Sequence, residues 1–355
     1  MITALHALAF LAPTLGGSTD QSEWLELDRE IANLGRAPGL AQDDPLGILY
    51  QFIVSYQKSN GDIYEVGGDD VLGAELRMAR LGFSGVYDDV RYKITGDLED
   101  GTMELKDAYL AWDCPGSCEL MLGQYKDPLL WSGRVDDFAD PFHDAEVTAE
   151  ENNERGVGAL FEGELGDLSG LLSVQNGADD VADELLFVGR VQWDIMGPGA
   201  FGDWHGAYGY GEDLSLSVAV GASDDGAIDN GTVTAEEAGL IVQAFSLRGS
   251  AVQYDDDYDA ETGLDLDDTL GTSKAGTSPT AITGGFLFDD DQWELLARWE
   301  RIDDGDDTSR SSFGLVWYTS LGPKARWALL YQEFSSDFEV LEGNRVELSF
   351  SLQSS

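Results

Sequence analysis

Apolar residues occur at every second position in many short runs along this chain. In residues 213–221, for example, Leu214, Leu216, Val218 and Val220 alternate with serine, alanine and glycine. Side chains in a β-strand point alternately to opposite faces, so each run predicts one apolar face and one small or charged face. Strands with this two-sided character are typical of a sheet that separates lipid from water.

The alternation predicts sixteen strands, and most have the roughly nine to eleven residues that a tilted strand needs to cross a bilayer. They are expected at 46–58, 74–86, 89–98, 103–113, 118–126, 156–164, 167–176, 184–194, 213–221, 237–247, 248–256, 279–288, 292–302, 311–320, 325–335 and 343–353. Short turns alternate with longer acidic loops, which is typical of outer-membrane barrels. Two connections depart from that rule, because 98–102 is short for a loop and 196–212 is long for a turn.

The predicted fold is therefore all-β: a 16-stranded antiparallel transmembrane β-barrel over residues 45–355, located in the cell outer membrane. Closure pairs every backbone group in lipid, which an open sheet cannot do. Sixteen strands enclose an aqueous channel. Tryptophans near the strand ends fit interfacial girdles; they are Trp112, Trp193, Trp293, Trp317 and Trp327. A soluble all-β protein with an aromatic core is the structural alternative.

Charge and cysteine content narrow the function and the compartment. The chain has 68 acidic and 20 basic residues, a net charge of -48, so it would repel phosphates and no nucleic acid partner is expected. The only two cysteines, Cys114 and Cys118, flank a Pro-Gly-Ser turn between two predicted strands. They predict a disulfide across a hairpin and hence an oxidising compartment. Their spacing does not fit a Cys-x-x-Cys redox motif.

The sequence pattern of residues 1–44 differs from the alternation in the predicted strands. Residues 1–18 are apolar and end in small residues, which predicts a signal peptide, atypical because no lysine or arginine precedes the run. Residues 19–44 have apolar residues at helical spacing followed by a glycine- and proline-containing stop. They predict a short periplasmic helix and linker, too short to fill a barrel lumen.

Several segments, taken in order, resemble the phosphate-selective porin O and P family. They are ELRMARLGFSGVYDDVRYKITGDLE (75–99), LKDAYLAW (105–112), LMLGQYKDPLL (120–130), ERGVGALFEGEL (154–165) and LLSVQNGADD (171–180). The resemblance implies a sixteen-stranded outer-membrane porin without a cofactor, assembled as a homotrimer, whose third loop folds inward to narrow the pore. In this chain that loop is about 127–155.

The family's preference for phosphate relies on basic residues at the constriction, whereas acidic residues dominate this loop. The residues expected at the constriction are Lys126, Arg134, Asp136, Asp137, Asp140, His143, Asp144 and Arg155. Ion preference follows the sign of charge at the narrowest point of a pore. The sequence thus predicts passive diffusion of small ions and solutes, with cations or neutral solutes favoured over phosphate.

Strand alternation also predicts which charged residues line the lumen wall. These are Arg80, Arg91, Lys93, Asp97, Asp107, Arg190, Glu294, Arg298 and Glu300. The basic members either face the acidic loop and create a transverse field, or pair with Asp97, Asp107, Glu294 and Glu300 and stabilise a polar interior.

Other function classes have weaker support in the sequence. The acidic segments 255–268 and 303–307 suggest a secreted or surface β-rich protein with Ca²⁺-binding loops, although neither has EF-hand spacing. Only three histidines occur, His6, His143 and His205, and none lies beside a serine in a predicted strand. We therefore predict neither an enzyme nor a metal site.

Overall fold

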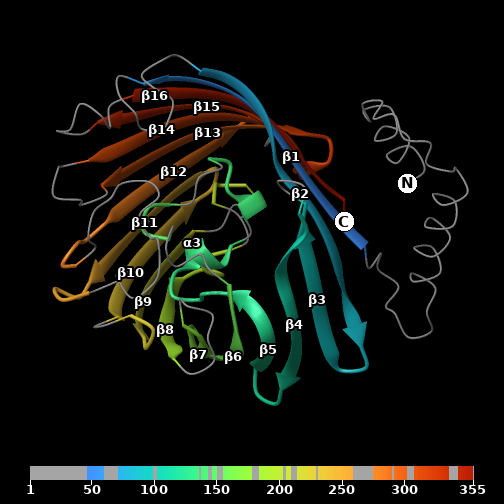
Figure 1. Ribbon diagram of the computed structural model, residues 1–355, viewed down its shortest axis with the longest axis vertical. Coiled ribbons are helices and arrows are strands. Elements are labelled where there is room, and N and C mark those ends of the chain that lie inside the picture. Colours follow the sequence, from blue (N-terminus) through green and yellow to red (C-terminus); the bar gives the residue numbers. More distant parts are fainter. Residues whose placement is uncertain are drawn as a thin grey trace, which may run out of the picture.

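Sixteen antiparallel strands form one closed barrel in which each strand pairs with its neighbours in the chain and β16 returns to β1 (Figure 1). The computed structural model describes residues 46–59, 71–98, 102–135, 137–142, 146–149, 155–177, 184–202, 205–208, 214–228, 231–258, 275–289, 292–301, 308–335 and 343–354. The predicted fold class is confirmed. The signal peptide and the helix predicted within 1–44 lie outside the described residues.

The strand bounds follow the alternating runs closely. The first eight strands are β1 (Leu46–Ser59), β2 (Val71–Tyr87), β3 (Val90–Asp97), β4 (Glu104–Cys114), β5 (Cys118–Lys126), β6 (Arg155–Leu165), β7 (Leu168–Asn176) and β8 (Leu185–Met196). The others are β9 (Ser215–Asp225), β10 (Gly231–Val242), β11 (Phe245–Tyr254), β12 (Thr280–Phe288), β13 (Trp293–Arg301), β14 (Ser309–Thr319), β15 (Gly322–Ser335) and β16 (Gly343–Ser354). A short helix α3 (Trp131–Arg134) and a 3-10 turn η2 (Asp137–Ala139) lie between β5 and β6.

One predicted turn is wrong. The strands predicted at 237–247 and 248–256 place a turn at their junction, around Arg248, but the chain reverses at Gln243 and Ala244, and Arg248 lies inside β11 with a buried side chain. Gln243 takes a positive φ of 53° without being glycine, so the usual sequence signal for this turn is missing. Arg248 resembled a solvated turn residue, whereas its side chain faces the barrel interior and is paired there.

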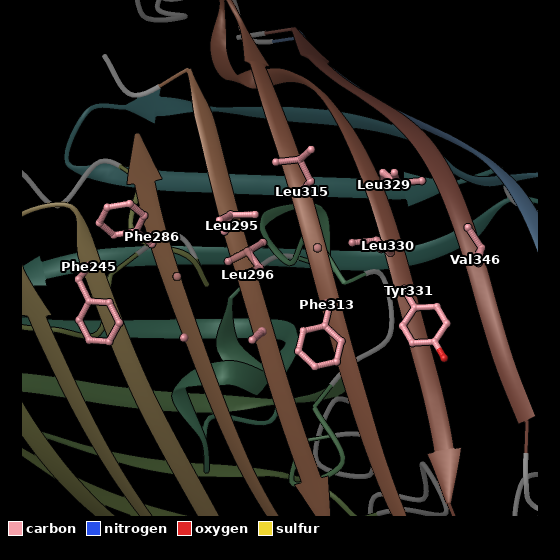
Figure 2. A pocket seen from close by; sticks show the side chains of 14 residues that line it. Phe245, Phe286, Leu295, Leu296, Phe313, Leu315, Leu329, Leu330, Tyr331 and Val346 are labelled. Carbon is pink, nitrogen blue, oxygen red and sulfur yellow. The ribbon is translucent and has the colours of Figure 1, made fainter. Parts of the chain in front are cut away.

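The outer face of the barrel is apolar and exposed. Figure 2 shows part of it, a shallow apolar groove over β11–β16 with a volume of about 620 Å³. Its exposed side chains include Phe245, Phe286, Leu295, Phe313, Leu329, Tyr331 and Val346. Apolar residues that cover a closed barrel on the outside have lipid as their natural neighbour. Within the described residues, no helix has the length and apolar character needed to cross a bilayer.

An aromatic row runs around the outside near one rim. Trp293, Trp317, Trp327 and Phe350 are direct cross-strand neighbours on β13–β16, and Phe52 of β1 follows Phe350. The rings of Trp293 and Trp317 stack with centroids 6.0 Å apart. Such rows mark the interface between hydrocarbon and headgroups, and this one lies toward the rim where β16 ends and the short turns gather.

The two rims of the barrel differ in their connections. The turns after β2, β6, β10 and β14 contain two residues each, whereas most connections at the opposite rim are longer. The end with the short turns and the strand termini corresponds to the periplasmic side of such barrels. Cys114 and Cys118 form a disulfide across the β4–β5 turn at this end, with Cα atoms 5.1 Å apart.

Candidate functional site: the barrel lumen

Two connections fold into the barrel and occupy part of its lumen. The first, here called the inner loop, runs from residue 127 to 154 between β5 and β6 and includes α3, which lies inside the ring of strands (Figure 1). The second, here called the inward turn, comprises residues 197–208 after β8. Its Ala200, His205 and Ala207 are buried. The inward turn lies within the long 196–212 connection that departed from the turn rule in the sequence.

Apolar contacts anchor the inner loop to the wall. Leu129 and Leu130 are fully buried against lumen-facing residues of β7–β11, among them Leu171, Val188 and Val252. At the other end of the loop, Phe142 packs into a second cluster with Ala207, Leu287, Leu296, Val316 and Leu330. The lumen face therefore carries apolar patches as well as small and charged residues, and these patches fix the inner loop in place.

An ion pair between the wall and the inner loop reinforces this anchor. Arg298 of β13 donates from Nη2 to Asp140 Oδ2 at 2.6 Å and lies 3.8 Å from Glu146 Oε1. Burial opposes ionisation of Asp140, but the nearby charges of Arg298 and His205 and the hydrogen bonds from Arg298 and the Phe142 N–H together outweigh it and hold the pKa of Asp140 below its usual value. Arg298 also lies over the ring of Phe142, 4.5 Å from its centroid.

Further wall residues bind the same loop. Glu300, also on β13, accepts a hydrogen bond from the backbone N–H of Val147 at 2.8 Å and pairs with Arg310. Arg326 of β15 donates to the carbonyl of Phe138. Charged groups on β13–β15 thus hold the inner loop through both its side chains and its backbone.

The wall formed by β2–β6 carries charge pairs of its own. Arg80 pairs with Asp97 at 3.2 Å, and both side chains are buried. Lys93 and Arg155 both contact Asp107, at 2.9 and 3.0 Å. The pairings with Asp97 and Asp107 are the ones that the polar-interior interpretation of the sequence expects.

Three predicted basic residues lie where the lumen is more open. The side chain of Arg91 is 47% exposed and contacts Asp113 and Glu119 near the disulfide turn. Arg134 of α3 makes a two-point contact with Glu162 of β6, at 3.2 and 2.8 Å. Lys126 donates to the carbonyl of Val135 at 2.9 Å and so ties the base of the inner loop.

The remaining predicted wall residues, Arg190 and Glu294, are buried and form hydrogen bonds inside the barrel. Arg190 of β8 donates to Glu237 of β10 at 3.0 and 2.8 Å, and Glu237 also accepts from the backbone N–H of Trp131 at 2.7 Å. Glu294 accepts from the N–H of Ala207 in the inward turn.

Some predicted constriction residues cannot be placed. Asp136, His143 and Asp144 lie outside the described residues, and Asp137 is described only through its backbone in η2. The acidic segment 303–307 lies outside as well, and so does most of 255–268. Among the residues that the structure does describe, no group of three metal-ligating side chains gathers.

A polar cavity of about 890 Å³ lies at the periplasmic end, beside the two inserted segments. The inner loop contributes Trp131, Arg134, Val135, Phe138 and Ala139, and the inward turn contributes Gly197, Pro198, Phe201 and Gly202. The opposite side is formed by the β6–β7 turn and by β8. Its charged lining consists of Glu162, Glu164, Asp167, Asp194, Arg134 and Arg190.

Exposure differs around the lumen wall. Lumen-facing residues of β10–β15 such as Glu237, Arg248 and Arg326 are at most 7% exposed, because the inserted segments cover them. On the other side, the side chains of Lys93, Arg134 and Glu162 keep about a third of their surface exposed. The open part of the lumen therefore runs beside β3–β6 and reaches the polar cavity at the periplasmic ends of β7 and β8.

The sequence did not single out several residues that organise this site. They are Glu162, Asp194, Glu237, Arg248 and Arg326. The alternation along the predicted strands places all of them except Arg248 on a lumen face, so this alternation was the available signal. Their partners lie far away in sequence or in an irregular segment, and that information is absent from a single strand.

Similarity of this chain to known proteins is found among solved structures. No protein-family model matches the chain, and no curated protein matches it. Several solved structures, however, resemble this chain in fold. The outer membrane channel DcaP of Acinetobacter baumannii has 15% identity and a TM-score of 0.56, covering 87% of this chain and 96% of that one. An anion-selective porin from Comamonas acidovorans has 14% identity and a TM-score of 0.55, with 87% and 98% covered. OmpT of Vibrio cholerae, lacking loop L8, has 12% identity and a TM-score of 0.54, with the same coverage.

At these identities the likeness establishes the fold, which is that of outer-membrane porins. It does not single out the phosphate-selective porin O and P family. Together with the apolar outer belt, the porin fold places the barrel in an outer membrane, as the alternation of the sequence predicted.

Proposed function

We propose that the protein is a passive porin, through which ions and small hydrophilic solutes diffuse along a water-filled path. The path runs beside β3–β6, where the inner loop leaves lumen-facing charges partly exposed. The polar cavity of about 890 Å³ forms its periplasmic vestibule. Its lining lets a solute exchange hydration water for polar side chains without crossing an apolar barrier.

The charge of this vestibule favours cations and neutral solutes over phosphate. Its described lining carries four carboxylates, Glu162, Glu164, Asp167 and Asp194, against two guanidinium groups, Arg134 and Arg190. Both guanidinium groups also pair with carboxylates, Arg134 with Glu162 and Arg190 with Glu237. In a narrow path with low-dielectric walls, an excess of negative charge concentrates cations and repels phosphate. This excess is the observation that carries the proposal.

The test is the reversal potential across a planar bilayer that separates two KCl concentrations. A shift toward the K⁺ equilibrium potential is expected. The double variant Glu164→Gln, Asp167→Asn removes two exposed carboxylates from the vestibule and should reduce that shift. Asp289→Asn removes an exposed carboxylate from the β12–β13 turn and is the matched control, with an unchanged potential expected. An anion-selective reversal potential in the wild-type protein would contradict the preference.

The expected homotrimer is a separate proposal, supported by the family resemblance of the sequence. Chemical crosslinking in detergent should give bands of one, two and three chains. A single-chain band at every crosslinker concentration would contradict it without affecting the porin function, because each barrel encloses its own path.

A further inference from the structure

The inward turn is held in the lumen by hydrogen bonds with side chains of the barrel wall. Arg248 of β11 is 4% exposed, and it donates from Nε to the carbonyl of Ala200 at 3.0 Å. Its Nη1 donates to the carbonyls of His205 and Gly206, at 2.5 and 3.1 Å. One wall guanidinium thus binds three backbone carbonyls on both halves of the inward turn. Charge-assisted hydrogen bonds of this kind are stronger than neutral ones.

Other wall residues complete this attachment. Ser217 Oγ accepts from the N–H of Ala200 at 2.8 Å and donates to Asp194. Glu294 accepts from the N–H of Ala207. The wall thus binds backbone groups of Ala200, His205, Gly206 and Ala207, which helps this irregular segment to stay inside the barrel.

Two lumen-facing glycines make room for it. A Cβ at Gly239 of β10 would meet the Cβ of Ala200 at 2.9 Å and the ring of Phe201 at 3.2 Å. A Cβ at Gly285 of β12 would meet Oε1 of Glu294 at 2.7 Å, Oγ of Ser246 at 2.8 Å and the Ala207 nitrogen at 3.1 Å. Contacts below 3.0 Å force a neighbouring atom to shift, so Gly239 leaves room for Ala200 of the inward turn, and Gly285 leaves room for the Glu294 side chain that accepts from the Ala207 N–H.

The inward turn also packs on the inner loop. Trp131 of α3 contacts the ring of Phe201, 5.6 Å between centroids, and the ring of His205 at 4.8 Å. The guanidinium of Arg248 lies over the Trp131 ring, 4.6 Å from its centroid. The Trp131 indole N–H donates to the carbonyl of Gly202 at 2.7 Å. The two inserted segments are thus joined as one body that shares Arg248.

We propose that the inward turn is a second pore-narrowing element, which enters from the periplasmic end and, joined to the inner loop, confines solutes to the wall of β6–β8. Pro198 and Phe201 line the vestibule directly, so they set its width together with Trp131 and Phe138 of the inner loop. Solute size is then limited by contacts between two inserted segments, rather than by the inner loop alone. This inference rests on the proposed porin function and adds a specificity-determining element to it.

The experiment shortens the connection by replacing residues 198–212 with Asn-Gly, a turn suited to adjacent antiparallel strands. The gel mobility of the unboiled protein reports that the barrel is closed. Single-channel conductance in KCl is then expected to rise at least about twofold, because ionic current scales with the open cross-section. The permeation rate of neutral sugars should rise as well, most for the largest sugars that pass.

A second variant covers the case in which the shortened chain does not fold. Arg248→Ala removes three hydrogen bonds to the inward turn, and conductance is expected to rise or to fluctuate between levels. Arg345→Ala is the matched control, because it also removes one largely buried lumen-facing cation but belongs to a contact with Glu347 and Gln332 on β15–β16. Its conductance should stay near that of the wild-type protein.

The outcomes separate this inference from the proposed function. A closed shortened barrel with wild-type conductance and sugar permeation would overturn the inference and leave the porin function intact. Absence of current in every protein would overturn both. If the shortened barrel carries current and the wild-type protein carries none, the wild-type path is not open. That result would show that the inward turn closes the path completely.

Discussion

Charged side chains inside this barrel are mostly paired across long sequence distances. Strand parity predicted that Arg80, Arg190 and Arg298 face the lumen, and the structure has them there. Their partners were predictable only in part. Asp97 lies on the strand next to Arg80, whereas Glu237 lies two strands from Arg190 and Asp140 lies in an irregular loop. Pairs of the latter kind depend on barrel closure and loop insertion, which no single alternating run encodes.

The buried Asp140–Arg298 pair should matter more for stability than an exposed pair. Asp140→Asn removes the carboxylate that contacts the buried Arg298 guanidinium at 2.6 Å. Among the described residues of the inner loop, Glu146 then remains as a carboxylate 3.8 Å from Arg298. We expect a loss of about 3 kcal/mol, as when one partner of a buried ion pair is removed. The denaturant midpoint of the transition from compact to unfolded gel mobility measures it.

The control for this variant is Asp113→Asn, which breaks a contact between two largely exposed side chains, Arg91 and Asp113. Exposed pairs contribute about 1 kcal/mol or less. Equal midpoints for Asp140→Asn and Asp113→Asn would contradict the anchoring role of Asp140.

His205 should make stability depend on pH. Burial lowers the pKa of His205 below its usual value, although Asp140 and Glu146 lie 3.8 and 4.0 Å from its Nδ1. The unfolded chain then binds a proton more readily than the folded one, so stability is lost as pH falls below about 6.5, the ordinary histidine pKa. His205→Gln should remove this slope between neutral pH and about pH 5, measured as the denaturant midpoint against pH. Identical slopes in both proteins would rule out His205 as its source.

At the level of elements, alternation located fourteen of the fifteen strand-to-strand connections well enough to identify the fold, and it misplaced one. The β10–β11 turn lacks glycine, and lumen-facing Arg248 resembled a loop residue. The inward turn was visible only as a connection of anomalous length. What fills a lumen is set by contacts between irregular segments and several strands, and these have no periodic signal.

The β4–β5 disulfide is expected to stabilise the barrel modestly and to leave transport unchanged. Cys114 and Cys118 close a very short loop, for which the chain-entropy relation gives about 2 kcal/mol. The double variant Cys114→Ser, Cys118→Ser should lower the denaturant midpoint accordingly at unchanged single-channel conductance. A change in conductance would show that this turn shapes the path, although its residues do not line the described vestibule.

For the whole molecule, the surface is inverted relative to a soluble protein. Large apolar side chains such as Leu172, Leu295 and Phe313 are more than half exposed, while charged residues such as Glu294 and Glu300 are fully buried. The protein should therefore need detergent to stay in solution, and it should migrate as a compact species on gels unless it is boiled. Ready solubility without detergent would favour the secreted binding protein over the porin.

The most direct test is the insertion of purified protein into a planar lipid bilayer under constant voltage. A closed barrel with a water-filled path beside its open wall predicts discrete upward current steps. Each step reports the insertion of open pores, and the current through one pore should vary linearly with voltage at small voltages. A protein that refolds to the compact gel form and binds the bilayer, but gives no steps at any voltage, would contradict it.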